Sequence, residues 1–192
     1  MNPAVDISQV TLGTPRLILR PWKLSDLSDF YRYASSPKVG PMAGWKPHES
    51  EEDSRAILER FIEGQKTFAI VHRETGRVIG SIGIEAYDEE AFAELAESKC
   101  RELGFVLAEE YWGQGLMPEA AEAVIAYLFS DLDLDFILCG HFARNKQSAR
   151  VQEKLGFKPY RIVEQRLRSS GNREEVHSTI LRREDYLASK LC

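Results

Sequence analysis

The stretch ELGFVLAEEYWGQGLMPEAAEAVIAYLF, residues Glu102–Phe129, decides the fold of this chain. An apolar run typical of a strand ends in a short turn that contains Gly113 and Gly115, and an amphipathic helix is expected to open at Pro118. A glycine turn at a helix start leaves main-chain N–H groups free at the positive end of the helix, which favours a phosphate or pyrophosphate ligand. The stretch therefore predicts a strand, a phosphate-binding turn and a helix.

Two familiar glycine motifs fit this turn badly. A P-loop requires Lys and then Ser or Thr after its second glycine, and no such pair follows Gly115. A dinucleotide fingerprint requires three glycines in a βαβ unit, whereas only two are present here, in mid-chain. Strand-to-helix turns also carry glycine for steric reasons alone, so the turn by itself leaves the ligand open.

Two further segments resolve the ambiguity. The segment Cys139–Lys158, CGHFARNKQSARVQEKLGFK, predicts a strand, a helix capped by Asn145, and a stop at Gly156 in the left-handed conformation. The segment Thr14–Pro21, TPRLILRP, predicts an early strand. Together with the glycine turn, these segments resemble the Gcn5-related N-acetyltransferase (GNAT) superfamily, and most closely its RimJ/RimL-like (ribosomal-protein-alanine N-acetyltransferase-like) branch. They keep their order and approximate spacing, and they span nearly the whole chain.

The resemblance implies an α/β fold in a single GNAT domain over residues 14–188. The expected sheet is mixed, mostly antiparallel, has about seven strands, and is splayed in the middle with about four flanking helices. Residues 1–13 are expected to form a loosely held lead-in. A terminal hairpin is expected to pair Tyr160–Arg168 with Glu174–Leu181 across a turn at Ser169–Asn172.

Composition limits the class of protein. The chain has 192 residues, of which 43% are hydrophobic and 29% charged, as is usual for one globular domain. No apolar run is long enough for a membrane span, and no secretory signal opens the chain. The net charge of −5 argues against a nucleic-acid binder. Three scattered cysteines and four scattered histidines form neither a metal site nor a disulfide framework, so a cytoplasmic protein without a metal is expected.

By the resemblance, the co-substrate is acetyl-CoA, held in a V-shaped opening between strands Leu103–Leu107 and Ile137–Phe142. The pantetheine arm is expected to bond main-chain groups as another strand would, and the pyrophosphate to take N–H groups of the turn. The expected binding residues are Phe105, Val106, Leu107, Trp112, Gly113, Gln114, Gly115, Leu116, Met117, Asn145 and Ser148. Met117 occupies a place where the general pattern has Gly or Ala, but it keeps the N–H that a pyrophosphate needs.

The ribose 3′-phosphate of coenzyme A requires a cation. The local basic excess contains Arg144, Lys146, Arg150, Lys154, Lys158 and Arg161. Most of these side chains are expected on a solvated face, and the sequence does not single out the one that meets the phosphate.

Acetyl transfer to an amine requires a base for the amine and a partner for the departing thiolate. Glu102 stands where some relatives have a catalytic glutamate, and partial burial would raise its pKa; the alternative is a surface ion pair. Seven residues after Asn145, where many relatives have a tyrosine acid, this chain has Gln152. The RimL-like branch suggests Ser148 for the thiolate, although serine is also common in a first helical turn. Tyr160 is a weaker candidate for the acid.

By the resemblance, the acceptor region is expected around the apolar, Pro- and Gly-rich loop 35–48, which carries Met42, Trp45 and His48, with Trp45 and His48 as contacts. Glu85 and the acidic residues after it would attract a cationic acceptor, namely a ribosomal-protein or other peptide N-terminus or a small amine. The alternative is an exposed acidic connection that aids solubility.

The leading hypothesis is an acetyl-CoA-dependent N-acetyltransferase in which a primary amine attacks the thioester directly. One alternative is a non-catalytic acyl-CoA-binding sensor or scaffold, motivated by the absence of tyrosine at Gln152. Another is a nucleotide-binding protein unrelated to acyl transfer. The sequence does not decide between a monomer and a homodimer.

Overall fold

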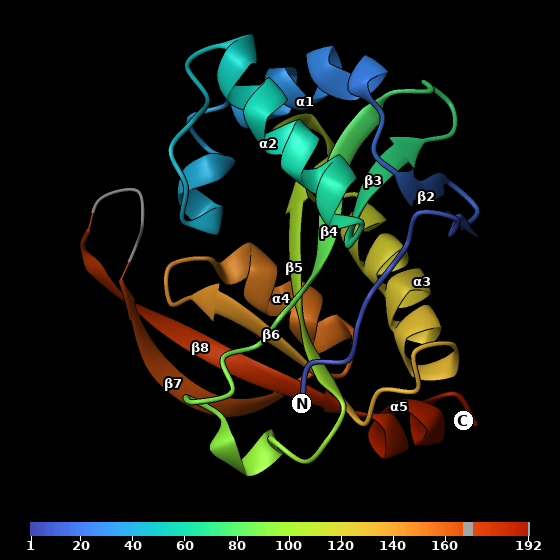
Figure 1. Ribbon diagram of the computed structural model, residues 1–192, viewed down its shortest axis with the longest axis vertical. Helices are drawn as coiled ribbons and strands as arrows, with labels where there is room; N and C mark the ends of the chain where they lie inside the picture. The colour runs from blue at the N-terminus through green and yellow to red at the C-terminus, as the bar shows by residue number, and fades with distance from the viewer. Residues whose placement is uncertain (167–170, 192) are drawn as a thin grey trace.

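One sheet of eight strands runs through the molecule in the order β1-β2-β3-β4-β5-β6-β8-β7 (Figure 1). The computed structural model describes residues 1–166 and 171–191. Cys192, the last two residues of the predicted strand Tyr160–Arg168 and the first two residues of the predicted turn Ser169–Asn172 therefore lie outside the described residues. The strands are β1 Leu12–Gly13, β2 Leu17–Pro21, β3 Thr67–His72, β4 Val78–Glu85, β5 Cys100–Leu107, β6 Phe136–Phe142, β7 Lys158–Arg166 and β8 Arg173–Arg182. The helices are α1 Leu27–Ala34, α2 Glu51–Gly64, α3 Leu116–Ser130, α4 Lys146–Lys154 and α5 Arg183–Ser189.

This architecture confirms the predicted single α/β domain with a mixed, mostly antiparallel sheet. The described part of the chain has eight strands rather than about seven, because β1 contains two residues and is too short to show a hydrophobic pattern. It has five α-helices rather than about four. The additional helix is α5, which packs Tyr186 against Phe129 of α3 with the ring centroids 5.2 Å apart.

The helix boundaries follow local capping. The side chain of Ser50 accepts a hydrogen bond from the N–H of Asp53, and the Asp53 carboxylate accepts one from the N–H of Ser50, so α2 begins with a capping box. Helix α3 begins at Leu116, two residues before the expected start at Pro118. Proline is tolerated there because the first N–H groups of a helix have no helical partner.

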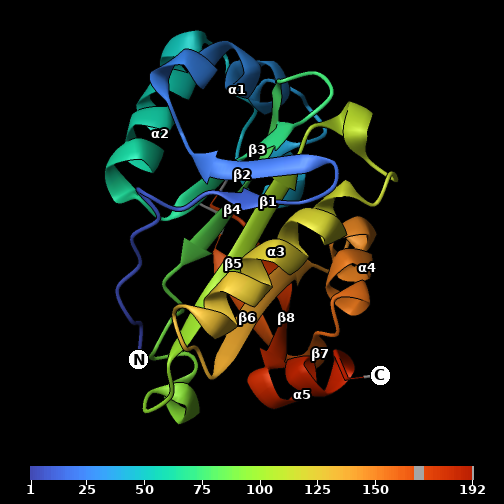
Figure 2. The ribbon, with the colours of Figure 1, turned by 90° about the vertical axis from the view of Figure 1, so that its right-hand side faces the viewer.

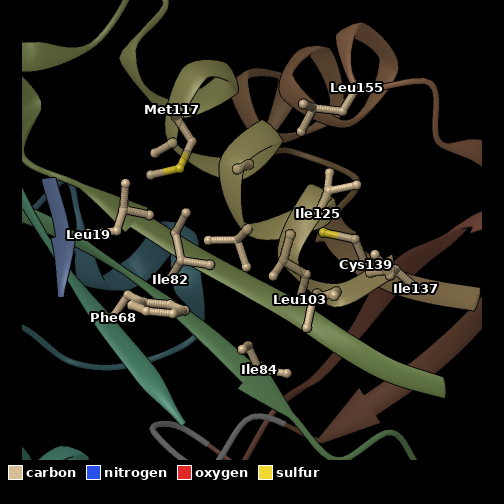
Figure 3. Close-up of a cluster of buried hydrophobic side chains, with 14 of the residues drawn as sticks. Leu19, Phe68, Ile82, Ile84, Leu103, Met117, Ile125, Ile137, Cys139 and Leu155 are labelled. Atoms are coloured by element: carbon tan, nitrogen blue, oxygen red, sulfur yellow. The ribbon is translucent and has the colours of Figure 1, made fainter. Parts of the chain in front are cut away.

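In the described chain, four clusters of apolar side chains lie on the sheet, and the smallest pairs Phe142 of β6 with Val176 of β8. The largest lies between α3 and strands β2–β6 and includes Phe68, Ile82, Leu103, Ile125 and Ile137 (Figure 3). Figure 2 shows α3 on this face with α4 beside it. A second cluster packs α1 and α2 against the opposite face of β3 and β4. A third, smaller cluster covers the corresponding face of β5, β6 and β8 and draws on the acidic connection before β5.

Residues 1–13 pack more closely than expected. Ile7 is fully buried in the main core, and its N–H donates a hydrogen bond to the carbonyl of Gln65. The N–H of Cys100 donates to the carbonyl of Met1, which ties the first residue to the start of β5. The prediction of a loosely held lead-in is therefore wrong.

The central strands separate, as predicted. Strands β5 and β6 run parallel but pair only over Cys100–Glu102 with Phe136–Leu138. Beyond this point β5 continues beside β4 toward α1 and α2, whereas β6 continues beside β8 (Figure 1). The result is an opening in the middle of the sheet. In the described chain, none of the helices combines the length and apolarity that a membrane crossing requires.

Candidate active site

A cavity of about 380 Å³, here called the larger cavity, lies between the end of β5, the glycine turn and α4. It is bordered by every residue predicted to bind acetyl-CoA except Gln114, namely Phe105, Val106, Leu107, Trp112, Gly113, Gly115, Leu116, Met117, Asn145 and Ser148. The side chain of Gln114 instead donates to the carbonyl of Glu110. The structure therefore brings the three sequence segments together around one space.

The glycine turn is set by backbone conformation. Gly113 and Gly115 have φ angles of +74° and +75°, in the left-handed region that other residues rarely adopt. A side chain at Gly113 would meet nothing within 4 Å, and one at Gly115 would meet only Arg16, at 3.7 Å. Both positions therefore border open space. The N–H groups of Leu116 and Met117 follow at the start of α3, where helical partners are lacking.

The segment around Arg16 braces this turn from β2. The Nε atom of Arg16 lies 2.7 Å from Oε2 of Glu119 in the first turn of α3, and Nη1 donates to the carbonyl of Gln114 at 3.0 Å. The hydroxyl of Thr14 donates to Oε1 of Glu119 at 2.6 Å. These contacts explain why the segment Thr14–Pro21 accompanies the glycine turn.

The main chain of β5 presents alternate residues to the opening. The carbonyl of Val106 faces β4, because a Cβ atom on Gly80 would lie 2.3 Å from it. By strand alternation, the main-chain groups of Phe105 and Leu107 face the opening. The Leu107 carbonyl accepts a hydrogen bond from Nε1 of Trp112 at 2.8 Å. The main chain of Val106 was predicted to bond the pantetheine, and this prediction is wrong because its carbonyl faces β4. Val106 nevertheless borders the cavity.

A second cavity of about 190 Å³, here called the smaller cavity, lies across the separated strands. Its wall includes the β5 residues 102–105 and the β6 residues 139–142. The two cavities share the lining residues Met42, Ala43, Phe105, Asn145 and Ser148, so they adjoin. This arrangement can hold two reactants that meet near Ser148.

Glu102 borders the smaller cavity and is half-buried. Its Oε1 atom lies 3.5 Å from the position that a Cβ atom on Gly140 would take. Burial raises the pKa of this carboxyl, and the charges of Glu85 and Asp88 raise it further. Among residues 1–166 and 171–191, no cation pairs with Glu102, which removes the surface ion pair as an explanation for it.

The start of α4 carries two predicted site residues. Oδ1 of Asn145 accepts a hydrogen bond from the N–H of Ser148 at 3.1 Å, which confirms the predicted cap. Nδ2 of Asn145 donates to the carbonyl of Met42 at 3.0 Å and so ties the apolar loop to α4. Oγ of Ser148 accepts from Nε2 of Gln152 at 3.0 Å. Gln152 is buried and borders neither cavity.

The three predicted acceptor contacts lie elsewhere. Trp45 packs against the ring of His48, with the centroids 5.2 Å apart, and Nδ1 of His48 lies 2.7 Å from the hydroxyl of Ser54. These contacts place both side chains in the packing around α1 and α2 instead of on a cavity wall. Glu85 forms an ion pair with Lys66 and acts on the site only through its charge.

Other residues of the apolar loop 35–48 border the cavities instead of Trp45 and His48. Val39, Met42 and Ala43 border the larger cavity, and Met42 and Ala43 also border the smaller one. The loop was predicted to lie at the site, but its sequence contains no signal that separates these side chains from Trp45, since all of them are apolar.

Four of the six basic side chains fall into two groups. Arg150 and Lys154 border the larger cavity. Arg144 pairs with Glu174, and Arg161 pairs with Glu94 at 2.6 Å. The hydroxyl of Tyr160 also donates to Glu94, so the weaker acid candidate lies outside both cavities.

A sheet that separates beside a glycine turn at a helix start defines the GNAT class of acetyltransferases. The family model described as "Acetyltransferase (GNAT) domain" matches residues 16–158, and the chain belongs to this family. The chain is 28% identical to the uncharacterized N-acetyltransferase p20 of Bacillus licheniformis, covering 92% of this chain and 98% of p20. It is 30% identical to the uncharacterized N-acetyltransferase YoaA of Bacillus subtilis, covering 83% of this chain and 89% of YoaA. The protein is an N-acetyltransferase.

Solved structures share the fold. A GNAT-family acetyltransferase from Bacillus anthracis has a TM-score of 0.79 at 22% identity, covering 91% of this chain and 99% of that one. The ribosomal-protein-S5-alanine acetyltransferase from Vibrio fischeri has a TM-score of 0.71 at 23% identity, covering 93% and 99%. The spermidine N-acetyltransferase from Vibrio cholerae, in complex with CoA and spermine, has a TM-score of 0.73 at 17% identity, covering 91% and 99%.

Proposed function

We propose that this N-acetyltransferase moves an acetyl group from acetyl-CoA to a primary amine, which attacks the thioester directly. The observation that carries the proposal is the position of Glu102. This carboxyl has a raised pKa, has no cationic partner in the described chain, and borders a cavity that adjoins the larger one at Ser148. A proton acceptor thus stands beside the place where two reactants would meet.

The larger cavity suits the acyl donor. The N–H groups from Gly113 to Met117 lie at the positive end of α3 and would bind the diphosphate. The main chain of Phe105 would bond the pantetheine, as an added strand does. Arg150 and Lys154 border the same cavity and are the cations assigned here to the 3′-phosphate.

The chemistry divides between two side chains. The Glu102 carboxylate takes a proton from the acceptor amine, whose nitrogen then forms a bond to the acetyl carbon. As the carbon–sulfur bond breaks, the thiolate leaves beside Ser148, which borders both cavities. The thiolate then takes the second proton that the nitrogen loses, so the products are the amide and the free thiol of coenzyme A. A hydrogen bond from the serine hydroxyl stabilises the negative charge on sulfur, because a charged acceptor strengthens such a bond.

The acceptor is assigned to the smaller cavity and to the class of cationic primary amines. Glu85 and Asp88 act on Glu102 through their negative charges, so the region around the cavity attracts a cation. The similar structures named above include an enzyme that acts on a ribosomal-protein alanine and one that acts on spermidine. A peptide N-terminus and a polyamine are therefore the two acceptor types to compare.

The test uses purified full chain. Calorimetry with coenzyme A should show a single site, and a thiol-release assay with acetyl-CoA should show turnover with one class of amine. The panel comprises peptides that begin with Ala or Ser, spermidine and spermine. Binding of coenzyme A without thiol release on any of these amines would contradict catalysis by Glu102, and absence of binding would contradict the assignment of the larger cavity.

A further inference from the structure

We propose that Gln152 is a positioning residue that directs the hydroxyl hydrogen of Ser148 toward the cavities and holds His141 as the tautomer protonated on Nδ1. The hydrogen-bond order, meaning which atom donates and which accepts in each contact of Gln152, follows from the geometry of the described residues alone. Its consequence for catalysis rests on the proposed function.

Gln152 uses both ends of its amide inside the protein, where its side chain is 1% exposed. Nε2 lies 3.2 Å from the carbonyl of Gly140 and 3.0 Å from Oγ of Ser148. Oε1 lies 2.9 Å from Nδ1 of His141 and 2.9 Å from the hydroxyl of Thr179. A buried amide with four polar neighbours has a defined orientation, since each neighbour must be matched as donor or acceptor.

The carbonyl of Gly140 decides that orientation. A carbonyl oxygen has no hydrogen, so the amide nitrogen must face it. The reverse orientation would place two carbonyl oxygens 3.2 Å apart with no hydrogen between them. Thr179 is compatible with the amide oxygen, because its hydroxyl hydrogen can be shared between Oε1 and the carbonyl of Cys139 at 3.0 Å.

This orientation determines what Ser148 can donate. Because Gln152 donates to Oγ, the serine oxygen is the acceptor in this contact and its own hydrogen is not used there. Ser148 borders both cavities, so that hydrogen is free to point to the place where they meet. Gln152 thereby keeps the hydroxyl hydrogen of Ser148 out of this contact, and it does so from the position where many relatives have a tyrosine.

The same orientation determines the protonation of His141. Oε1 of Gln152 can only accept, so Nδ1 of His141 carries a hydrogen. Burial lowers the pKa of His141, so the ring is neutral at neutral pH and Nε2 is its unprotonated nitrogen. His141 borders the smaller cavity together with Glu102. Nε2 thus provides a hydrogen-bond acceptor for an amine N–H in the cavity assigned to the acceptor.

The direct test is a ¹⁵N NMR spectrum of the histidine side chains in the wild-type protein, at about pH 8, where histidines are neutral. The His141→Phe variant identifies the signals of His141, and His48, His72 and His177 serve as internal references. The expected result is a protonated Nδ1 and an unprotonated Nε2. A hydrogen on Nε2 and none on Nδ1 would mean that the amide is reversed, and would overturn the proposal.

The functional test compares Gln152→Met with Glu153→Met, a substitution at the adjacent, exposed residue of α4. We expect Gln152→Met to lower kcat about tenfold with the KM for acetyl-CoA changed less than about twofold, and Glu153→Met to change neither. In a Ser148→Ala background, Gln152→Met should lower kcat by less than it does in the wild-type protein, because the part of its effect that acts through the serine is already lost. Independent, multiplying effects of the two substitutions would contradict the proposal.

The two tests separate this inference from the proposed function. A protein that transfers no acetyl group but has the Nδ1-protonated His141 would contradict the proposed function and retain the hydrogen-bond order. An active protein with His141 protonated on Nε2 would do the opposite. The NMR measurement uses the wild-type protein and His141→Phe, and no variant of Gln152. It therefore decides the geometry even if Gln152→Met does not fold.

Discussion

The two adjoining cavities are built in different ways. The larger one offers main-chain groups: a turn with two left-handed glycines, the first N–H groups of α3, and the outward groups of β5. The smaller one depends on side chains that come from separate strands, with Glu102 from β5 and His141 from β6. Most substitutions leave main-chain hydrogen-bonding groups in place, so a site made of such groups keeps them when a side chain changes. A site made of side chains loses a group with each substitution.

Under the proposed function, the same difference separates coenzyme A binding from acetyl transfer. Substitutions in the smaller cavity should change turnover and leave the affinity for coenzyme A intact, whereas substitutions in the glycine turn should do the reverse. Four predictions test this division.

The largest effect is expected for Glu102→Gln. Removal of a general base costs about 10²–10⁴-fold in rate, so kcat should fall by that factor. The affinity for coenzyme A, measured by calorimetry, should change by less than about twofold, because the substitution is isosteric and lies in the smaller cavity. The matched control is Glu97→Gln, an exposed residue of the acidic connection. An unchanged kcat in Glu102→Gln would show that another group takes the proton.

A main-chain site is tested by Gly113→Ala, with Gly76→Ala as control. The two glycines have φ angles of +74° and +67°, and a side chain at either meets nothing within 4 Å. Both variants should lose about 1 kcal/mol of stability through the same backbone strain. Only Gly113→Ala should weaken coenzyme A binding, by about tenfold, since its methyl group enters the space assigned to the diphosphate. Equal affinities of the two variants would place the diphosphate elsewhere.

The assignment of the 3′-phosphate is tested with Lys154→Ala. An exposed ion pair contributes up to about 1 kcal/mol, so the affinity for coenzyme A should fall about threefold. The affinity for 3′-dephospho-coenzyme A should not change. Lys158→Ala removes an exposed cation of the same basic run that does not border the cavity, and it should affect neither ligand. A loss that is the same for both ligands would assign Lys154 to another part of the donor.

The smallest effect is a displaced pH profile. Glu102 accepts a proton only when it is ionised, so kcat/KM for the amine should fall as the pH drops through its pKa. The charge of Glu85 raises that pKa, after the larger contribution of burial. Glu85→Gln should therefore lower the pKa of Glu102 and move the acid limb of the profile to lower pH. A limb that moves to higher pH, or an identical shift in Glu97→Gln, would contradict this coupling.

The main-chain features of the fold and of the larger cavity were predictable from sequence because they have local signals. Glycine at 113 and 115 indicates left-handed turns, Asn145 indicates a cap three residues before Ser148, and alternation indicates the strands. The resemblance to the GNAT superfamily, carried by three segments in their order along the chain, was needed to place them around one opening.

Other features depend on contacts that a single sequence does not show. The direction of the Val106 carbonyl is set by the register of β5 against β4, and the position of Trp45 by its packing on His48. The partners of Gln152 come from β6, β8 and α4, so its role is invisible until the sheet is assembled. Residues 1–13 lack a strong hydrophobic pattern, yet Ile7 enters the core, where its N–H donates to the carbonyl of Gln65 just after α2.

The brace at Arg16 has a consequence for dissecting the chain. Arg16 and Glu119 are 103 positions apart, and they join β2 to the first turn of α3. A fragment that begins after β2 would retain both glycines, the helix and every cavity residue from Val39 onward, but it would lose the cation that fixes Gln114 and Glu119. A fragment that binds the diphosphate as proposed is therefore expected to start before Thr14, far upstream of the glycine turn assigned to that contact.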